Sequence, residues 1–204
     1  MKRLFRVLIL PLLLGNAAAW VSFPKQPQTS TAILPFLESA RKLGPVGTFR
    51  SMKDQDDVLS AAKQLSGSDP RPADVPLQGV HRLVYSGAPG ASSGKLFGKV
   101  AGQVTQTFVN STHFINAVEW GPLKIELLAR RQRKNAKQLD VFFEETTIRV
   151  FGQPVSSKRL PGTSGGSWKY LWVGVVEEGS NRKLVRVMET PSLFVLEHVL
   201  DDNK

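Results

Sequence analysis

Two Gly/Ser-rich stretches come nearest to a catalytic motif in this chain. Residues 90–94 (GASSG) and 162–166 (GTSGG) both fit G-x-S-x-G, the pattern around the nucleophile of many serine hydrolases. That motif needs a sharp turn from a strand into a helix, which lifts the serine above a parallel sheet. No helical pattern follows either stretch, so we expect neither to supply a nucleophile and we predict no catalytic residue.

The histidine and cysteine content indicates no metal site. The chain has no cysteine and three histidines, His81, His113 and His198, whose spacing fits neither H-x-x-x-H nor H-E-x-x-H. We expect each histidine to be a strand residue with an ordinary hydrogen bond. The sequence therefore predicts no metal and no cofactor.

A basic run is the first candidate interaction surface. It consists of Arg130, Arg131, Arg133, Lys134 and Lys137, between two predicted strands. Five positive charges could contact an anionic lipid surface. A solvated hairpin tip is the alternative interpretation, because exposed loops often carry such charge. Nucleic acid is not an expected partner, since no aromatic residues for base stacking are interleaved with the run.

Alternating side chains on two neighbouring predicted strands form the candidate ligand-binding site. Side chains two residues apart on a strand point to the same face. If the two faces meet, they form an aromatic wall that contains one cation. Ordinary core packing is the alternative for the aromatic stripe. The candidate ligand-binding residues are Trp168, Tyr170, Trp172, Leu184, Arg186 and Met188.

Arg186 would need a partner in such a place, because an unpaired buried charge is costly. Two interpretations remain open. In the first, an acid such as Glu189 or Glu197 pairs with Arg186 and the pair is a structural clamp. In the second, a carbonyl, phosphate or carboxylate of a ligand satisfies the guanidinium.

The elements that must position these residues are short β-branched and aromatic runs separated by turn residues, which is typical of an antiparallel all-β domain. Many of the runs are apolar on both faces, so the outer face must meet a helix, a membrane or a partner. With short connections they predict a small up-and-down β-barrel over residues 77–204. The expected strands are 80–85, 102–109, 112–120, 123–129, 139–145, 147–151, 168–176, 183–189 and 192–200.

One short amphipathic helix is expected before the barrel. Residues 54–65 place apolar side chains at helical spacing, and the Pro-rich stretch 68–76 cannot continue a helix. We assign 53–76 to this helix and its connector.

The first quarter of the chain holds most of the formal charge of +10 and looks like a targeting sequence. Basic residues, a short apolar run and Ala17–Ala18–Ala19 predict a secretory signal peptide over 1–19, with an uncleaved anchor as the alternative. Residues 20–52 are rich in hydroxyls and basic groups and contain one acid, Glu38. Together the two segments resemble the two-part presequence of plastid proteins. A secreted protein with an N-terminal linker is the alternative.

Two blocks of the chain resemble the plastid lipid-associated protein (fibrillin) family. They are LQGVHRLVYS at 77–86 and KLVRVMETPSLFVL at 183–196, and the resemblance extends over about residues 53–200. His81 stands where the family usually has Trp, and Glu189 where it often has Arg. The resemblance implies a lipocalin-like barrel, not an enzyme, located at thylakoids or plastid lipid droplets (plastoglobules), with peripheral membrane contact.

The function expected from the resemblance is to bind or carry a prenylquinone, a carotenoid or another lipid. The alternative is a structural coat protein of plastid lipid bodies, with a filled barrel and no specific ligand. An enclosed cavity would distinguish the two, because small-molecule sites need roughly 300–1,000 Å³.

Overall fold

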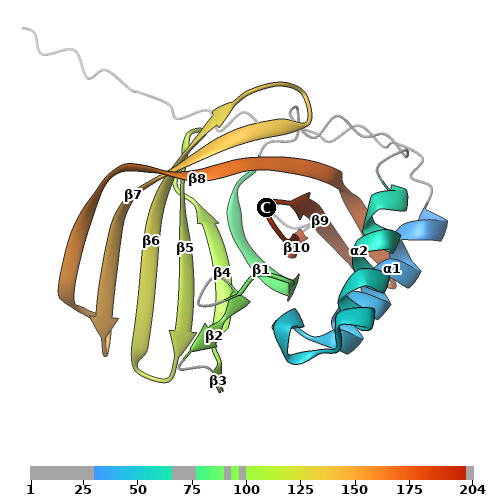
Figure 1. The fold of residues 1–204 in the computed structure, drawn as a ribbon, viewed down its shortest axis with the longest axis horizontal. Helices are drawn as coiled ribbons and strands as arrows, with labels where there is room; N and C mark the ends of the chain where they lie inside the picture. The colour runs from blue at the N-terminus through green and yellow to red at the C-terminus, as the bar shows by residue number, and fades with distance from the viewer. Residues whose placement is uncertain (1–29, 66–76, 90–92, 97–99, 201–204) are drawn as a thin grey trace, which may run out of the picture.

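The computed structural model describes residues 30–65, 77–89, 93–96 and 100–200. This part of the chain is mostly β: an antiparallel sheet closes into a ring after two N-terminal helices (Figure 1). The helical elements are α1 (Ser30–Leu43), the 3₁₀ helix η1 (Gly47–Phe49) and α2 (Met52–Leu65). The strands are β1 (Gly79–Ser86), β2 (Lys95–Leu96), β3 (Val100–Ala101), β4 (Gln103–Phe108), β5 (His113–Trp120), β6 (Leu123–Arg133), β7 (Gln138–Val150), β8 (Gln153–Glu178), β9 (Asn181–Glu189) and β10 (Leu193–Leu200).

The ring has the order β1-β10-β9-β8-β7-β6-β5-β4, so from β4 to β10 each strand pairs with the next one in the chain. It closes because β1 pairs with both ends of this meander. Arg82 lies opposite Thr105 of β4 and also opposite Glu197 of β10. Strands β2 and β3 form a separate two-stranded sheet. The predicted antiparallel, closed arrangement is therefore confirmed.

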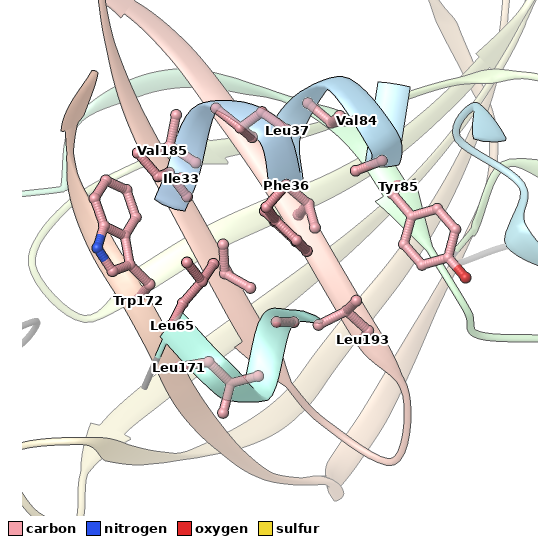
Figure 2. Close-up of a cluster of buried hydrophobic side chains, with 14 of the residues drawn as sticks. Ile33, Phe36, Leu37, Leu65, Val84, Tyr85, Leu171, Trp172, Val185 and Leu193 are labelled. Atoms are coloured by element: carbon pink, nitrogen blue, oxygen red, sulfur yellow. The ribbon is translucent and has the colours of Figure 1, made fainter. Parts of the chain in front are cut away.

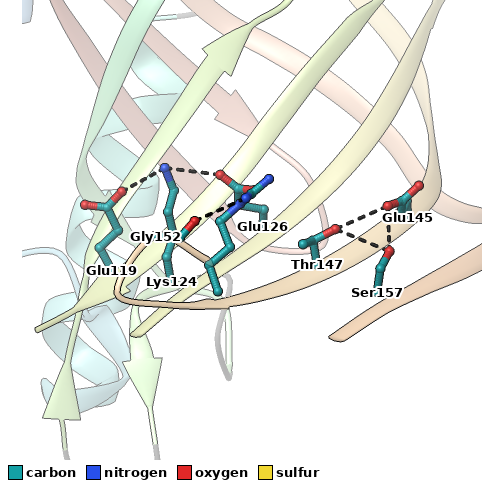
Figure 3. A network of polar contacts seen from close by, with 8 residues as sticks. Glu119, Lys124, Glu126, Glu145, Thr147, Gly152 and Ser157 are labelled. Carbon is teal, nitrogen blue, oxygen red and sulfur yellow. Dashed lines mark hydrogen bonds and ion pairs between the residues drawn. The ribbon is translucent and has the colours of Figure 1, made fainter. Parts of the chain in front are cut away.

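Strands β7 and β8 are longer than predicted. The expected strands 139–145 and 147–151 are one strand, with a register irregularity between Phe143 and Glu145. Residues 153–167, which belong to none of the expected strands, are part of β8. Hydroxyl contacts across the two strands help to hold this polar region: Ser157 donates to Glu145 at 2.6 Å, and Thr147 also donates to Glu145 (Figure 3).

The turn between β7 and β8 has two residues with left-handed backbone. Phe151 has a φ of 49° and Gly152 a φ of 79°. Positive φ at two successive residues matches the right-handed twist of a tight hairpin. It is unusual for a bulky residue such as Phe. The Phe151 ring is 81% exposed.

The prediction of a single N-terminal helix was wrong, because α1 lies inside the segment assigned to a transit peptide. Its buried residues follow the i, i+3, i+4, i+7 spacing of an amphipathic helix: Ile33, Phe36, Leu37 and Ala40. They pack with α2 against the outer face of β1, β8, β9 and β10 (Figure 2). The composition of the segment gave no sign of this helix, because polar residues such as Ser39, Arg41 and Lys42 lie on its exposed face.

Polar contacts also join the helices to the ring. Arg41 of α1 donates to Glu178 of β8 and to Glu197 of β10, each at 2.6 Å. The backbone N–H of Ser86 donates to the carbonyl of Pro45 at 3.0 Å. Both helices are thus part of the same packed unit as the ring.

Candidate functional site: the interior of the ring

A second cluster of buried residues fills the inner face of the ring. Its members come from strands all around the ring, so their side chains converge on the interior. The cluster is separate from the helix-facing one. The buried members on the strands are Phe108, Phe114, Ala129, Leu139, Val141, Trp168, Tyr170, Val173, Leu184, Met188 and Leu196.

Four of the predicted ligand-binding residues lie in this interior cluster: Trp168, Tyr170, Leu184 and Met188. A fifth, Arg186, is on the same face of β9 as Leu184 and Met188 and is 1% exposed. The two strand faces meet as expected, since Tyr170 lies opposite Met188 in the β8–β9 pair.

Trp172 does not belong to this site. The pairing of β8 with β9 shifts between Tyr170 and Trp172, because Tyr170 pairs with Met188 whereas Trp172 pairs with Val187. An extra residue at such a bulge reverses which face the following side chains point to. Trp172 therefore packs against the helices (Figure 2). The expectation that the three aromatics share one face was wrong.

The side-chain contacts of Arg186 are made with neutral groups. Its Nη1 donates to Oε1 of Gln106, across the ring on β4. Its Nη2 lies 3.5 Å from the Tyr170 hydroxyl and 3.2 Å from the Met188 sulfur. The guanidinium carbon is 5.0 Å from the centre of the Phe108 ring, a cation–π arrangement. Its Nε is buried without a hydrogen-bond partner.

Among the described residues, no acid pairs with Arg186. The two acids proposed for a clamp are engaged elsewhere: Glu197 pairs with Arg41 and Lys183, and Glu189 pairs with Lys63. The guanidinium charge is therefore held by an amide, a phenol, a thioether and a ring face. The interpretation in which Glu189 or Glu197 pairs with Arg186 as a structural clamp is therefore wrong.

Arg131 lies beside the same aromatic ring and is not part of the exposed hairpin tip. Its guanidinium carbon is 4.9 Å from the centre of the Phe108 ring, and its Nε donates to the Ser111 carbonyl at 3.0 Å. The pKa of Arg131 is lowered, chiefly by burial; the charge of Arg186 also lowers it, whereas Tyr170 raises it. Arg131 thus belongs electrostatically to the ring interior.

The rest of the basic run divides in two. Arg130 is held by Glu144 at 3.2 Å and lies over the Phe142 ring. Arg133, Lys134 and Lys137 are exposed at the turn between β6 and β7. These three are the most exposed members of the basic run, and the side chain of Arg130 is 40% exposed.

His81 is buried inside the ring. The side chain is 0% exposed, and among the described residues no side chain forms a hydrogen bond with either ring nitrogen. It contacts Phe108 and His198, with ring centres 5.2 and 5.0 Å away. The pKa of His81 is lowered from 6.5 to about 2, chiefly by burial and then by the charge of Arg186 and by His198; interaction with the backbone of Gln78 raises it. The residue is neutral at physiological pH.

This buried neutral histidine predicts acid sensitivity. Below pH 6.5 His81 becomes protonated in the unfolded chain, whereas in the folded chain it stays neutral down to about pH 2. The free energy of unfolding therefore falls as the pH falls from 6.5 towards 2. We expect the free energy of unfolding to drop by about 2 kcal/mol between pH 7 and pH 5 from this group. Urea unfolding at the two pH values measures the drop. His81→Leu should remove most of it, whereas His113→Leu, at a half-exposed histidine, should leave it in place. An equal drop in wild type and His81→Leu would contradict the assignment.

Sequence reasoning missed Gln106, Phe108 and Arg131 as parts of this site. Gln106 is a polar residue at an inward position of β4, between Val104 and Phe108. That break in an apolar alternation is the signal that could have identified it. Among the described residues no group of acids and histidines could hold a metal ion. Of the two G-x-S-x-G stretches, 162–166 lies within β8, and 90–94 falls largely outside the described residues.

In comparisons with known proteins, no family model, curated protein or solved structure matches this chain.

Proposed function

We propose that this chain is a plastid lipid-associated protein of the fibrillin type, whose ring is a lipocalin-like barrel that binds a hydrophobic small molecule. Prenylquinones, carotenoids and other lipids are the ligand classes that the sequence resemblance implies. The observation that carries the proposal is Arg186, which is 1% exposed in the ring interior and has no acid partner among the described residues.

A purely structural core gives no reason for such a residue. Removing a guanidinium from water costs several kcal/mol, and well-packed apolar residues of similar volume often replace buried charges with no loss of stability. A polar group of a ligand would complete the contacts that the protein leaves unfinished at Nε. The buried charge therefore supports a binding protein over a filled barrel.

The alternative is a structural coat protein without a specific ligand. It is supported by aromatic rings that pack on one another inside the ring: Phe114 lies 5.9 Å from Phe108 and 5.5 Å from Trp168 between ring centres. These contacts fill part of the interior.

Organic extraction of the purified protein, followed by mass spectrometry, tests the two functions. The protein should be expressed in a host that makes prenylquinones and carotenoids and purified without detergent. A lipid recovered at about one per chain after size exclusion supports the binding function. Extracts that match a mock purification, together with no binding of added lipid, would leave the coat function.

We also propose that membrane or lipid-droplet contact is peripheral and partly electrostatic. Neither described helix reaches the length and hydropathy needed to cross a bilayer. The exposed basic residues of the β6–β7 turn are the candidate contact: Arg133, Lys134 and Lys137.

Neutralising this turn is expected to weaken binding to anionic vesicles. Each basic residue near an anionic surface contributes about 1 kcal/mol, so changing Arg133, Lys134 and Lys137 to Gln should lower affinity up to roughly 100-fold at low salt. Sedimentation with phosphatidylglycerol-containing vesicles at several salt concentrations measures this. The matched control neutralises three exposed basic residues elsewhere: Lys42, Lys158 and Arg159. An equal loss of vesicle affinity in both triple variants, or no loss in the first, would contradict a membrane contact at this turn and support the solvated-hairpin interpretation.

The localisation proposed is the plastid, reached through a secretory signal over residues 1–19 followed by a transit segment. Residues 1–29 lie outside the described part of the chain. Because α1 is packed into the domain, we propose that the removed transit segment ends before Ser30 instead of at residue 52.

A further inference from the structure

Two positive groups and one phenol lie close together on the ring: Arg186 and Tyr170 are buried, and Arg131 is half-buried. Arg131 and Arg186 both place their guanidinium carbons within 5.0 Å of the centre of the same Phe108 ring, and Tyr170 interacts with both. The three residues come from β6, β9 and β8, so residues that are far apart in the sequence are brought together by strand pairing in the sheet.

Within the described part of the chain, no acid contacts this group. The side-chain contacts of Arg186 are all neutral, and Arg131 bonds to a backbone carbonyl. The Gln106 side chain presents its amide oxygen to Arg186, because its Nε2 donates a hydrogen bond to Asn116 at 2.9 Å. These partners orient the guanidinium groups but do not neutralise them. Nearby His81 is neutral and supplies no negative charge.

We propose that the ring binds an amphipathic lipid with an ionised head group, a carboxylate or a phosphate monoester, which Arg186 and Arg131 hold. The inference rests on the proposed binding function and names the ligand class. Charge-assisted hydrogen bonds from a guanidinium to a carboxylate or phosphate are about twice as strong as neutral ones. Arg186 has an unused buried donor at Nε, and Tyr170 can donate its hydroxyl to the same head group.

The rest of the interior fits the tail of such a molecule. Phe114, Trp168, Val173 and Leu184 are buried apolar residues on the same inner face. A neutral prenylquinone or carotenoid would also satisfy these apolar contacts. Neither would compensate the two positive charges, so the charge imbalance separates these ligand classes.

Three probes with the same tail and different head groups test the inference: dodecanoate, dodecyl phosphate and dodecanol. Calorimetric titration of the wild-type chain should give at least 10-fold tighter binding of one or both anions than of dodecanol. Tighter binding of dodecanoate indicates a carboxylate ligand, and tighter binding of dodecyl phosphate indicates a phosphate. Dodecanol binding as tight as that of both anions would overturn the head-group inference and leave the binding function standing. No binding of any probe, with no lipid in the extracts, would refute both.

Two charge-removing variants and a matched control locate the head group. Arg131→Met and Arg186→Met keep much of the side-chain length but lose the charge. Each should weaken anion binding about 10-fold or more and leave dodecanol binding nearly unchanged. The control is Arg130→Met, next to Arg131 in the chain but paired with Glu144; it should bind all three probes like wild type. If Arg186→Met does not fold, Arg131→Met carries the test. Anion binding that falls equally in Arg130→Met and Arg131→Met would overturn the assignment.

Discussion

A chain that begins at Met52, without α1, is expected to lose most of its stability relative to one that begins at Ser30. Ile33, Phe36 and Leu37 are each no more than 4% exposed, and burying a large apolar side chain contributes about 1.5–3 kcal/mol. Their loss removes roughly 5–9 kcal/mol, which is comparable with the whole stability of a typical domain. Denaturant unfolding of the two chains, followed by circular dichroism, measures the difference.

A point substitution in the longer chain tests the same packing. Leu37→Asp places a charge at a site that is 0% exposed and should abolish the cooperative transition. Ser39→Asp adds the same charge on the exposed face of α1 and should change stability by less than about 1 kcal/mol. Equal stability of the chains that begin at residues 30 and 52 would restore the transit-peptide boundary at residue 52.

The two tryptophans on β8 should respond differently to substitution. Trp172→Ala is expected to lower the free energy of unfolding by about 3–5 kcal/mol, because the ring packs between the sheet and the helices. Under conditions where this variant is folded, its affinity for dodecanol should equal that of wild type. Trp168→Ala should lower that affinity by about 10-fold, since Trp168 lines the interior. The opposite pattern, with Trp172→Ala losing lipid and Trp168→Ala keeping it, would contradict the two-face assignment.

The fold could be predicted from the sequence where the spacing of apolar residues along a segment matches the side chains that are buried in the structure. The chain-order meander follows from runs such as 113–120 and 193–200, whose ends are marked by turns. Two features could not be predicted in this way. Helix α1 has the period of a helix but the composition of a targeting sequence, and the β7–β8 extension is polar and stabilised by pairing across strands.

The site was partly predictable for a related reason. Alternation on β9 correctly placed Leu184, Arg186 and Met188 on one face. The same rule failed for Trp172, because a bulge adds one residue and a sequence period does not reveal a bulge. Arg131 was grouped with its neighbours in the sequence, although the residue it meets, Phe108, lies two strands away in the sheet and is brought to it by the β4–β5 and β5–β6 pairings.

The most direct test of lipid binding inside the ring is the NMR response of the tryptophan indole N–H groups. The Trp168 indole lies in the interior cluster and donates to the Gly165 carbonyl at 3.2 Å, whereas the Trp172 indole lies among the helices. Addition of dodecanoate or dodecanol to labelled protein should shift the Trp168 resonance in a saturable way and leave the Trp172 resonance in place. A saturable shift confined to Trp172, or no shift of Trp168 at saturating lipid, would contradict an interior binding site.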